Sequence, residues 1–355
     1  MRFSTVKIII KKRIKTMSKA DMTGLKYFIV HMCVEIICFH LLRYYYPTEL
    51  AGIIALTYDF FAFVPQGIIG DFIKKHNKVP YESIAHIFMF MSIFLVSSSF
   101  QAVHIIGYVF LATGNAILHE CGAIATVADS EGKMFPAALF VAGGSFGLVI
   151  GQTFGIYQIS LYVLIIPLLI SWLLTLTTKK SVRAVNFPEF KSANMKKNPV
   201  TLLVAVFAVT AVRSYIAYAI PISWKKELWQ TFLLFFIMGF GKGMGGFVSD
   251  RIGARKTALF STLSAIPFLV AGENIMVLSI IGVCLFSMTM SITFEMSLNV
   301  LPKDPGLAFG VTTIGLFFGL LPAFFIQVSK MTNIMLVIVL SVLCFVILSK
   351  TLDKR

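Results

Sequence analysis

Long apolar stretches recur along almost the whole of this 355-residue chain, and they limit its fold more than any other feature. A helix that crosses the hydrocarbon core of a bilayer needs about 20 mostly apolar residues. Hydrophobic residues make up 57% of the chain and charged residues 13%, against about 45–50% and about 25% in soluble domains. The sequence therefore predicts an all-α integral membrane protein with twelve transmembrane helices. These spans are expected at 22–43, 48–71, 80–98, 103–125, 134–155, 159–177, 199–221, 228–249, 256–272, 273–298, 306–327 and 332–350.

Lys and Arg residues are distributed unevenly between the two ends of the predicted spans. With twelve crossings, the two tails and the loops after even-numbered spans lie on one side, which holds 24 of the 31 Lys and Arg residues. Four lie on the other side and three inside spans. Cytoplasmic loops carry an excess of Lys and Arg. We therefore expect both termini in the cytoplasm and the protein in the cytoplasmic membrane. The net charge of +15 then marks the inner face next to the lipid bilayer rather than a nucleic-acid partner.

The longest polar segment between spans, residues 178–198, divides them into two groups of six. It is basic and is expected to be a cytoplasmic linker, with a regulatory docking segment as the alternative. The N-terminal tail is expected to be either solvated or a short helix on anionic lipid. The predicted parts are a basic tail at 1–21, an N-terminal half at 22–177, the linker at 178–198, a C-terminal half at 199–350 and a tail at 351–355.

A loop motif occurs once in each predicted half. The loop after the eighth span reads Gly246-Phe-Val-Ser-Asp250-Arg251-Ile-Gly253-Ala-Arg255-Lys256. It resembles the signature loop of the major facilitator superfamily, G-x-x-x-D-R-x-G-x-[RK]-[RK]. The loop after the second span runs from Gly67 through Asp71 to Lys74 and Lys75, and it lacks the Arg and the second Gly. The resemblance implies two six-helix halves that alternate access to a central cavity, as internal repeats do in many transporters.

The resemblance also implies that these loops gate the cytoplasmic side. Glycine allows close helix approach, and each Asp is expected to face the positive N-terminal end of a helix in the opposite half, near Pro136 or Pro305. A solvated turn that only sets topology is the alternative. The candidate gating residues are Gly67, Asp71, Gly246, Asp250, Arg251, Gly253, Arg255 and Lys256.

Glycines at a four-residue spacing mark the fifth and eleventh spans. Small residues at this spacing permit close backbone packing. In the superfamily, the fifth, eighth, second and eleventh helices form the moving boundary between the halves, so we expect these glycines to lie there; static packing is the alternative. The residues are Gly143, Gly147, Gly151, Gly155, Gly315 and Gly319.

Polar and charged residues inside spans are candidates for a binding site, because a charge near the bilayer centre costs at least about 2.5–3.5 kcal/mol. In the superfamily, helices one, four, seven and ten surround the central cavity. A buried carboxylate is able to carry a proton, whereas Arg213 would contact an anionic substrate or pair with a carboxylate. The acidic surplus favours a cationic or zwitterionic substrate, or protons. The candidates are His31, Glu35, Asp59, Asn115, His119, Glu120, Arg213 and Glu295, and each has purely structural packing as its alternative.

These features predict a secondary active transporter that moves a small molecule by alternating access, with a monomeric functional unit and proton coupling as a further hypothesis. Multidrug or lipid-like efflux is a weaker alternative, because drug exporters of the superfamily usually carry an Arg in helix four and a Gly-Pro pair in helix five. Here the fourth span has Asn115, and the fifth has no matching Pro. A non-transporting receptor or regulatory protein on the same fold is a further alternative.

Partial matches to enzyme motifs occur in the sequence, but each lacks the surrounding residues or elements that its chemistry needs. Gly241 to Gly246 matches G-x-G-x-x-G but lies inside an apolar span, where no strand precedes it. His119 and Glu120 begin an H-E-x-x-H pattern, but Ala123 replaces the second His. The five cysteines form no C-x-x-C pair. We therefore predict no enzyme, no cofactor and no metal site.

Overall fold

The computed structural model describes residues 17–46, 50–190, 198–220, 222–326 and 328–352, and every regular element in these ranges is a helix. The first 16 residues of the expected N-terminal tail lie outside the described residues. So do residues 191–197 of the expected linker and residues 353–355 of the expected C-terminal tail.

The residues before the expected linker form helices at each predicted span. The second span is split into two helices, because Pro65 has no N–H to continue the hydrogen-bond ladder of the first. The helices are α2 (Lys19–Tyr45), α3 (Leu50–Phe63), α4 (Gln66–Lys75), α5 (Tyr81–Leu95), α6 (Gln101–Ala128), α7 (Phe135–Ile156), η1 (Leu161–Leu164) and α8 (Ile165–Leu176), and the short helix α9 (Lys179–Val182) follows at the start of the expected linker.

The residues after the linker repeat this pattern, and their tenth span is also split, at Met288. Gly253 has a φ of 90°, a conformation that disfavours any side chain, and there the chain turns from α11 into α12. The second glycine of the loop motif therefore has a backbone reason. The helices are α10 (Pro199–Ala219), α11 (Leu228–Ile252), α12 (Ala254–Ala271), α13 (Met276–Ser287), α14 (Thr289–Val300), α15 (Pro305–Phe325) and α16 (Lys330–Thr351).

The outer surface is strongly apolar. Within the described ranges, nine helical stretches are long and apolar enough to cross a membrane, and α5 and η1–α8 are shorter apolar helices. Ile68, Phe100 and Tyr162 each expose more than three quarters of their surface, at 77%, 76% and 79%. Exposed apolar area on this scale marks a surface that faces lipid or a partner. The chain is an integral multi-pass membrane protein, and the count of twelve crossings stays a prediction.

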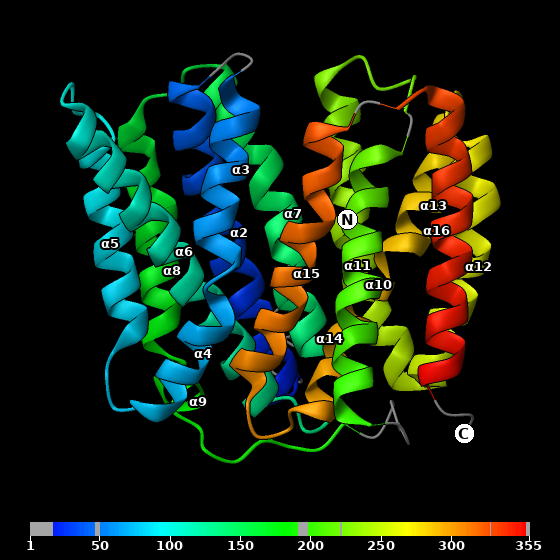
Figure 1. Cartoon of the computed structure of the whole chain (residues 1–355). Coiled ribbons are helices and arrows are strands. Elements are labelled where there is room, and N and C mark those ends of the chain that lie inside the picture. The colour runs from blue at the N-terminus through cyan, green and yellow to red at the C-terminus, as the bar shows by residue number, and fades with distance from the viewer. Residues whose placement is uncertain (1–16, 47–49, 191–197, 221, 327, 353–355) are drawn as a thin grey trace, which may run out of the picture.

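The helices form two bundles, which we call the N-terminal half (α2–α9) and the C-terminal half (α10–α16) (Figure 1). They meet where α7 packs on α11 and where α4 packs on α15. We call the end of the bundle with α9 the linker end, and the opposite end the Tyr46 end. The positive-inside count predicts that the linker end faces the cytoplasm.

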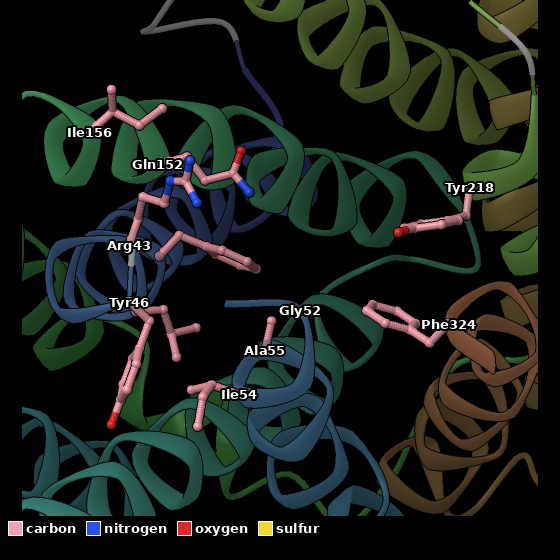
Figure 2. Close-up of a pocket in the computed structure, with 11 residues that line it drawn as sticks. Arg43, Tyr46, Gly52, Ile54, Ala55, Gln152, Ile156, Tyr218 and Phe324 are labelled. Carbon is pink, nitrogen blue, oxygen red and sulfur yellow. The ribbon is translucent and has the colours of Figure 1, made fainter. Parts of the chain in front are cut away.

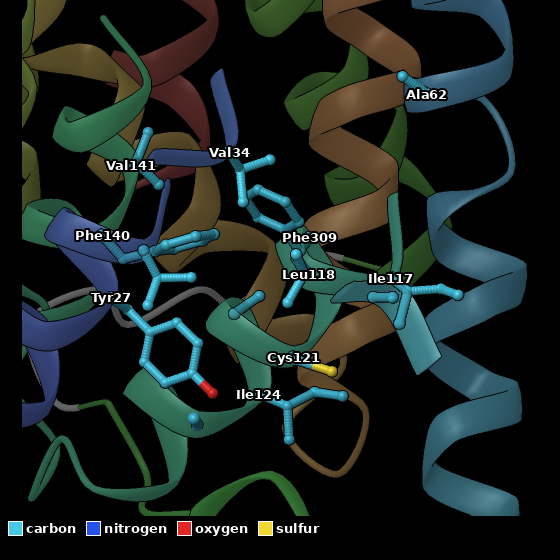
Figure 3. Packing of buried hydrophobic residues seen from close by; sticks show 14 of the residues in the cluster. Tyr27, Val34, Ala62, Ile117, Leu118, Cys121, Ile124, Phe140, Val141 and Phe309 are labelled. Carbon is cyan, nitrogen blue, oxygen red and sulfur yellow. The ribbon is translucent and has the colours of Figure 1, made fainter. Parts of the chain in front are cut away.

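The main buried cluster lies in the N-terminal half and reaches α15 across the boundary (Figure 3). The Phe140 ring of α7 meets the Tyr27 ring of α2 edge to face, with ring centroids 6.3 Å apart. Phe140 also packs against Phe309 of α15, at 5.6 Å. Aromatic pairs in these geometries add about 0.5–1.5 kcal/mol beyond burial. The cluster therefore holds α15 against the N-terminal half.

The glycine stripes pack within each half, so the expectation that they lie on the moving boundary is wrong. A methyl group on the α7 glycines, Gly143 to Gly155, would collide with the backbone or Cβ atoms of α2. One on Gly315 or Gly319 would meet α10. A stripe of small residues shows that a close neighbour exists, but not which helix it is. The close crossings between the halves use other glycines: Gly67 lies against Gly310, and Gly70 against Gly306.

Candidate functional site

A cavity of about 200 Å³ lies between the halves, at the middle of the bundle. Aromatic and aliphatic side chains form much of its wall, including Phe63 and Phe309, and a few polar groups converge on it. Small-molecule sites have this mixture of apolar walls and few placed polar groups. The polar lining comes from the N-terminal half through His31, Glu35, Asp59, Ser145 and His119, and from the C-terminal half through Lys242 and Thr313.

Glu35 is the centre of the polar wall. Its Oε1 lies 3.6 Å from His31 Nε2, one helical turn away on α2, and 3.4 Å from His119 Nε2 on α6. The two imidazole rings meet edge to face, with centroids 4.2 Å apart. Asn115 Nδ2 donates to Glu35 Oε1 at 3.3 Å and to the Tyr58 hydroxyl at 2.6 Å. Asn115 therefore supports the cluster from behind instead of lining the cavity.

Lys242 lines the cavity but is not among the residues predicted from the sequence. It lies on α11, and its Nζ donates to Ser145 Oγ of α7 across the boundary, at 2.8 Å. The same reasoning that selected Arg213, a cation inside an apolar span, applies to Lys242. The cavity therefore has acidic groups and histidines on one wall and a cation on the other.

Besides Asn115, three predicted cavity residues do not line the cavity. Arg213 is buried on α10, and its Nε and Nη2 have no hydrogen-bond partner among the described residues. Glu295 is buried on α14 and accepts a bond from Ser249 Oγ at 2.9 Å. Glu120 is fully buried beside the crossing of Gly70 and Gly306, and neither of its carboxylate oxygens has a hydrogen-bond partner among the described residues. Glu120 thus lies toward the linker end, between helices of both halves.

A second cavity, of about 350 Å³, lies toward the Tyr46 end. Figure 2 shows Tyr218 and Phe324 of the C-terminal half on one side and Tyr46, Gly52 and Ala55 on the other. Phe39 lines both this cavity and the central one, so the two adjoin at its ring. The central cavity therefore shares a wall residue with the cavity toward the Tyr46 end.

Contacts between the halves gather at the linker end. Asp250, at the end of α11, accepts hydrogen bonds from the backbone N–H of Met134 at 2.7 Å and of Phe135 at 2.9 Å. These N–H groups begin α7, the fifth span, where the helix dipole favours a negative charge. Gly246 makes this approach possible, because a methyl group there would collide with Ala138 and Met134.

The first copy of the motif differs from the expectation. Asp71 pairs with Lys75 of its own helix, at 2.6 Å, and does not reach the start of α15. Lys74 instead forms an ion pair with Asp304, which is the N-cap residue of α15. The contact thus joins the expected helices, but the acid sits on the C-terminal half and the cation on the N-terminal half.

The remaining motif residues stay within the C-terminal half. The Arg251 guanidinium lies 3.4 Å from the centroid of the Phe247 ring, a cation–π contact within α11. Arg255 Nε donates to the Leu352 carbonyl at 2.9 Å, and so holds the end of α16. Lys256 is exposed. These residues are placed to order the loop rather than to bridge the halves.

Asp129, which follows α6 at the linker end, ties three segments together. It accepts bonds from Lys19 Nζ at 2.6 Å and Thr23 Oγ1 at 2.8 Å on α2, and from Ser181 Oγ of α9 at 2.6 Å. Burial opposes ionisation of this carboxyl, but these hydrogen bonds outweigh it and lower its pKa. The start of the linker is therefore fixed to the N-terminal half.

Comparisons with known proteins identify the fold. No protein-family model matches the sequence, and no curated protein sequence matches it. Two solved structures superpose on 93% of the chain and 96% of their own. One is a variant of the E. coli fucose:proton symporter FucP, with a TM-score of 0.62, and the other is FucP described as a major facilitator superfamily transporter in the outward conformation, with a TM-score of 0.61. Both are 14% identical to this chain. The protein therefore has the fold of the major facilitator superfamily transporters.

Proposed function

We propose that this protein is a secondary active transporter with twelve membrane crossings, which carries a small molecule by alternating access between its halves. The observation that carries the proposal is the central cavity, which polar side chains of both halves line. A site on the boundary is exposed to one side or the other when the halves rock about it. The fold and its structural neighbour, a fucose:proton symporter, support transport of a small solute without fixing which one.

The contacts at the linker end support a state closed on that side. Asp250 holds the start of α7, Lys74 pairs with Asp304, and the backbones of α4 and α15 touch through glycine. The adjoining cavity at the Tyr46 end gives this state an opening on the other side. Alternation then requires the linker-end contacts to break and the Tyr46-end walls to close.

Cross-linking the linker end tests this proposal. The five free cysteines are first replaced by serine, and Lys74→Cys and Asp304→Cys are combined with the pocket substitution Thr313→Cys. In oriented vesicles, a membrane-impermeant maleimide added at the linker end should label position 313. An oxidised 74–304 cross-link should abolish this labelling, and a reductant should restore it. If labelling is the same with and without the cross-link, or never occurs from the linker end, alternating access is rejected and a non-transporting receptor is favoured.

Proton coupling is a second part of the proposal, motivated by three carboxyl groups at membrane depth. Glu35 and Asp59 line the cavity, and Glu120 lies at the crossing of the halves with no hydrogen-bond partner in the described ranges. Burying an ionised carboxylate without a partner is very costly, so a closed linker end favours a proton on Glu120. The acidic wall of the cavity favours a cationic or zwitterionic substrate.

A reconstituted flux assay tests the coupling, with a substrate taken from a thermal-shift screen of metabolites and drugs. We expect a pH gradient to drive flux in the wild type, and Glu35→Gln, Asp59→Asn or Glu120→Gln to uncouple it. Gln at position 120 keeps the shape of the neutral acid, so the protein should remain folded. If all three variants keep the wild-type response to the gradient, these carboxyls do not carry the coupling proton.

A further inference from the structure

Three acceptor atoms converge at the wall of the central cavity. One ring nitrogen of His31, one of His119 and a carboxylate oxygen of Glu35 all lie within 4.8 Å of one another, and all three residues are buried. The ligands come from α2 and α6 of one half, so both rigid helices hold them in place.

The backbone fixes the tautomer of each histidine. His31 Nδ1 lies 2.8 Å from the Phe140 carbonyl, and His119 Nδ1 lies 3.0 Å from the Asn115 carbonyl. A carbonyl only accepts, so each Nδ1 carries a hydrogen and donates it. In the neutral ring the other nitrogen is then a free acceptor, and the two Nε2 atoms lie 3.6 and 3.4 Å from Glu35 Oε1. Metal-bound histidines usually have this arrangement, with the second ring nitrogen donating to a backbone carbonyl or carboxylate.

The separations fit an ion between the atoms better than a direct bond. Distances of 3.4 and 3.6 Å from Nε2 to Glu35 Oε1 exceed the 2.7–3.2 Å of ordinary N–H···O bonds. Tetrahedral ligands bound at about 2.0–2.1 Å lie roughly 3.3 Å apart. Two imidazoles and one carboxylate suit zinc and its first-row neighbours, whereas magnesium and calcium prefer oxygen ligands.

We propose that His31, Glu35 and His119 bind a divalent first-row transition-metal ion, and that this ion is a transported cation. The assignment of the ion as cargo rests on the proposed transport function; the binding itself does not. The three ligands leave coordination positions open toward the cavity, where Asp59 lies on the same wall. An ion held by three groups of one half, with open positions, is able to exchange when the cavity opens.

The positive charge of Lys242 allows binding of a cation to be distinguished from binding of an anion. It lines the same cavity from α11 and would repel a bound cation. Removing this charge in Lys242→Met should therefore tighten metal binding. An anion-binding pocket would respond in the opposite direction, because it would lose its cation.

The test uses the purified full chain in detergent, stripped of metal with a chelator. Zn²⁺ is titrated by calorimetry, and Co²⁺ is followed by its visible ligand-field absorption. We expect a single saturable site per chain for both ions and none for Ca²⁺. His119→Gln and Glu35→Gln should each raise the Kd by at least about 100-fold, since even an outer-shell partner of a metal ligand contributes 10–100-fold.

His40→Gln is the matched control. His40 lies on the same helix, but its Nε2 meets the Ile159 carbonyl, at 2.9 Å, instead of the Glu35 carboxylate. The control should keep wild-type affinity, and size-exclusion profiles should show that all variants fold. Absence of saturable Zn²⁺ and Co²⁺ binding, or equal loss in His40→Gln and His119→Gln, would overturn the site.

Uptake into vesicles that contain a metal-sensitive dye then tests the ion as cargo. Binding without uptake would remove the transport assignment and leave the site. If the protein fails to bind metal, but labelling of position 313 still depends on the 74–304 cross-link, this inference alone would be overturned. Failure of alternation with intact metal binding would overturn the proposed function instead.

Discussion

Lys74 and Asp304 form an ion pair between the two halves at the linker end, and it reverses the polarity expected from the loop motif. Asp304 is the residue before α15, so its charge lies at the start of that helix, where the dipole stabilises it. Lys74 then reaches across from α4. The neighbouring pair of Lys75 and Asp71 stays within α4.

Loss of this pair should make the linker end open more often. The side chains of Lys74 and Asp304 are partly exposed, at 36% and 27%, so the pair contributes about 0.2–1 kcal/mol. Lys74→Ala should therefore raise the rate of maleimide labelling at Thr313→Cys about 1.4- to 5-fold from the linker side. Lys75→Ala is the control and should leave the rate unchanged. Equal effects of the two substitutions would contradict a bridge between the halves.

Asp250 should have a larger effect, because both of its oxygens accept backbone N–H groups of α7. Hydrogen bonds to charged groups contribute about 1.5–3 kcal/mol. Asp250→Ala should raise linker-end opening by about 10- to 150-fold in the same labelling assay. Ser249→Ala, which removes a bond to Glu295 within the C-terminal half, should lower the melting temperature without changing the labelling rate.

Gly310 should tolerate no side chain where it contacts Gly67 in the closed state. A methyl group at Gly310 would collide with the backbone of Gly67, which cannot move away without separating α4 from α15. Gly310→Ala should therefore favour the open linker end and reduce transport, while the protein is still produced. Gly243→Ala is the control, since its nearest neighbours across the α11–α7 boundary would lie 3.9 Å away. Similar losses in both variants would show that glycine at the boundary matters for some other reason.

Asp129 should make stability depend on pH. Its hydrogen bonds lower its pKa below the unfolded value of about 3.9, so its contribution is complete above that value. The contribution is lost as the pH falls through the lower folded pKa. Asp129→Asn should lower the melting temperature at pH 7, and the difference from wild type should shrink below about pH 4. Glu131→Gln, at an exposed neighbouring residue, should match wild type at every pH. A pH-independent loss in Asp129→Asn would point to packing instead of charge.

The helices were predictable because their signal is local. Each span is an apolar window of helical length, and Pro136 and Pro305 mark helix starts where a missing N–H is tolerated. The contact of Asp250 with the start of α7 also follows from local features, a charged loop and a helix dipole. The helices and one of the two linker-end contacts are therefore predictable from the sequence.

The other contacts depend on helix rotation and on which helices become neighbours. Asp71 and Lys74 are three residues apart, so a modest rotation of α4 decides which of them faces Asp304. The proposed metal-ligand triad joins residues of α2 and α6 that are 84 or more positions apart, so no spacing motif describes it. The prediction of no metal site rests on such motifs, whereas the proposed site would be assembled from residues of two helices. Lys242 is not among the predicted residues, although the sequence shows its position inside an apolar span.

The glycine stripes bring the backbones of α7 and α2, and of α15 and α10, into direct contact. We therefore expect each of these helix pairs to move as a rigid unit. Substitutions at glycines within a half should therefore have a different effect from substitutions at glycines between the halves. In a mutagenesis screen that scores protein abundance and uptake independently, bulky replacements at Gly147 or Gly319 would remove the protein from the membrane. Replacements at Gly310 would leave the protein's abundance unchanged and abolish uptake. The two classes of glycine, within and between the halves, would therefore give different phenotypes although their sequence spacing is similar.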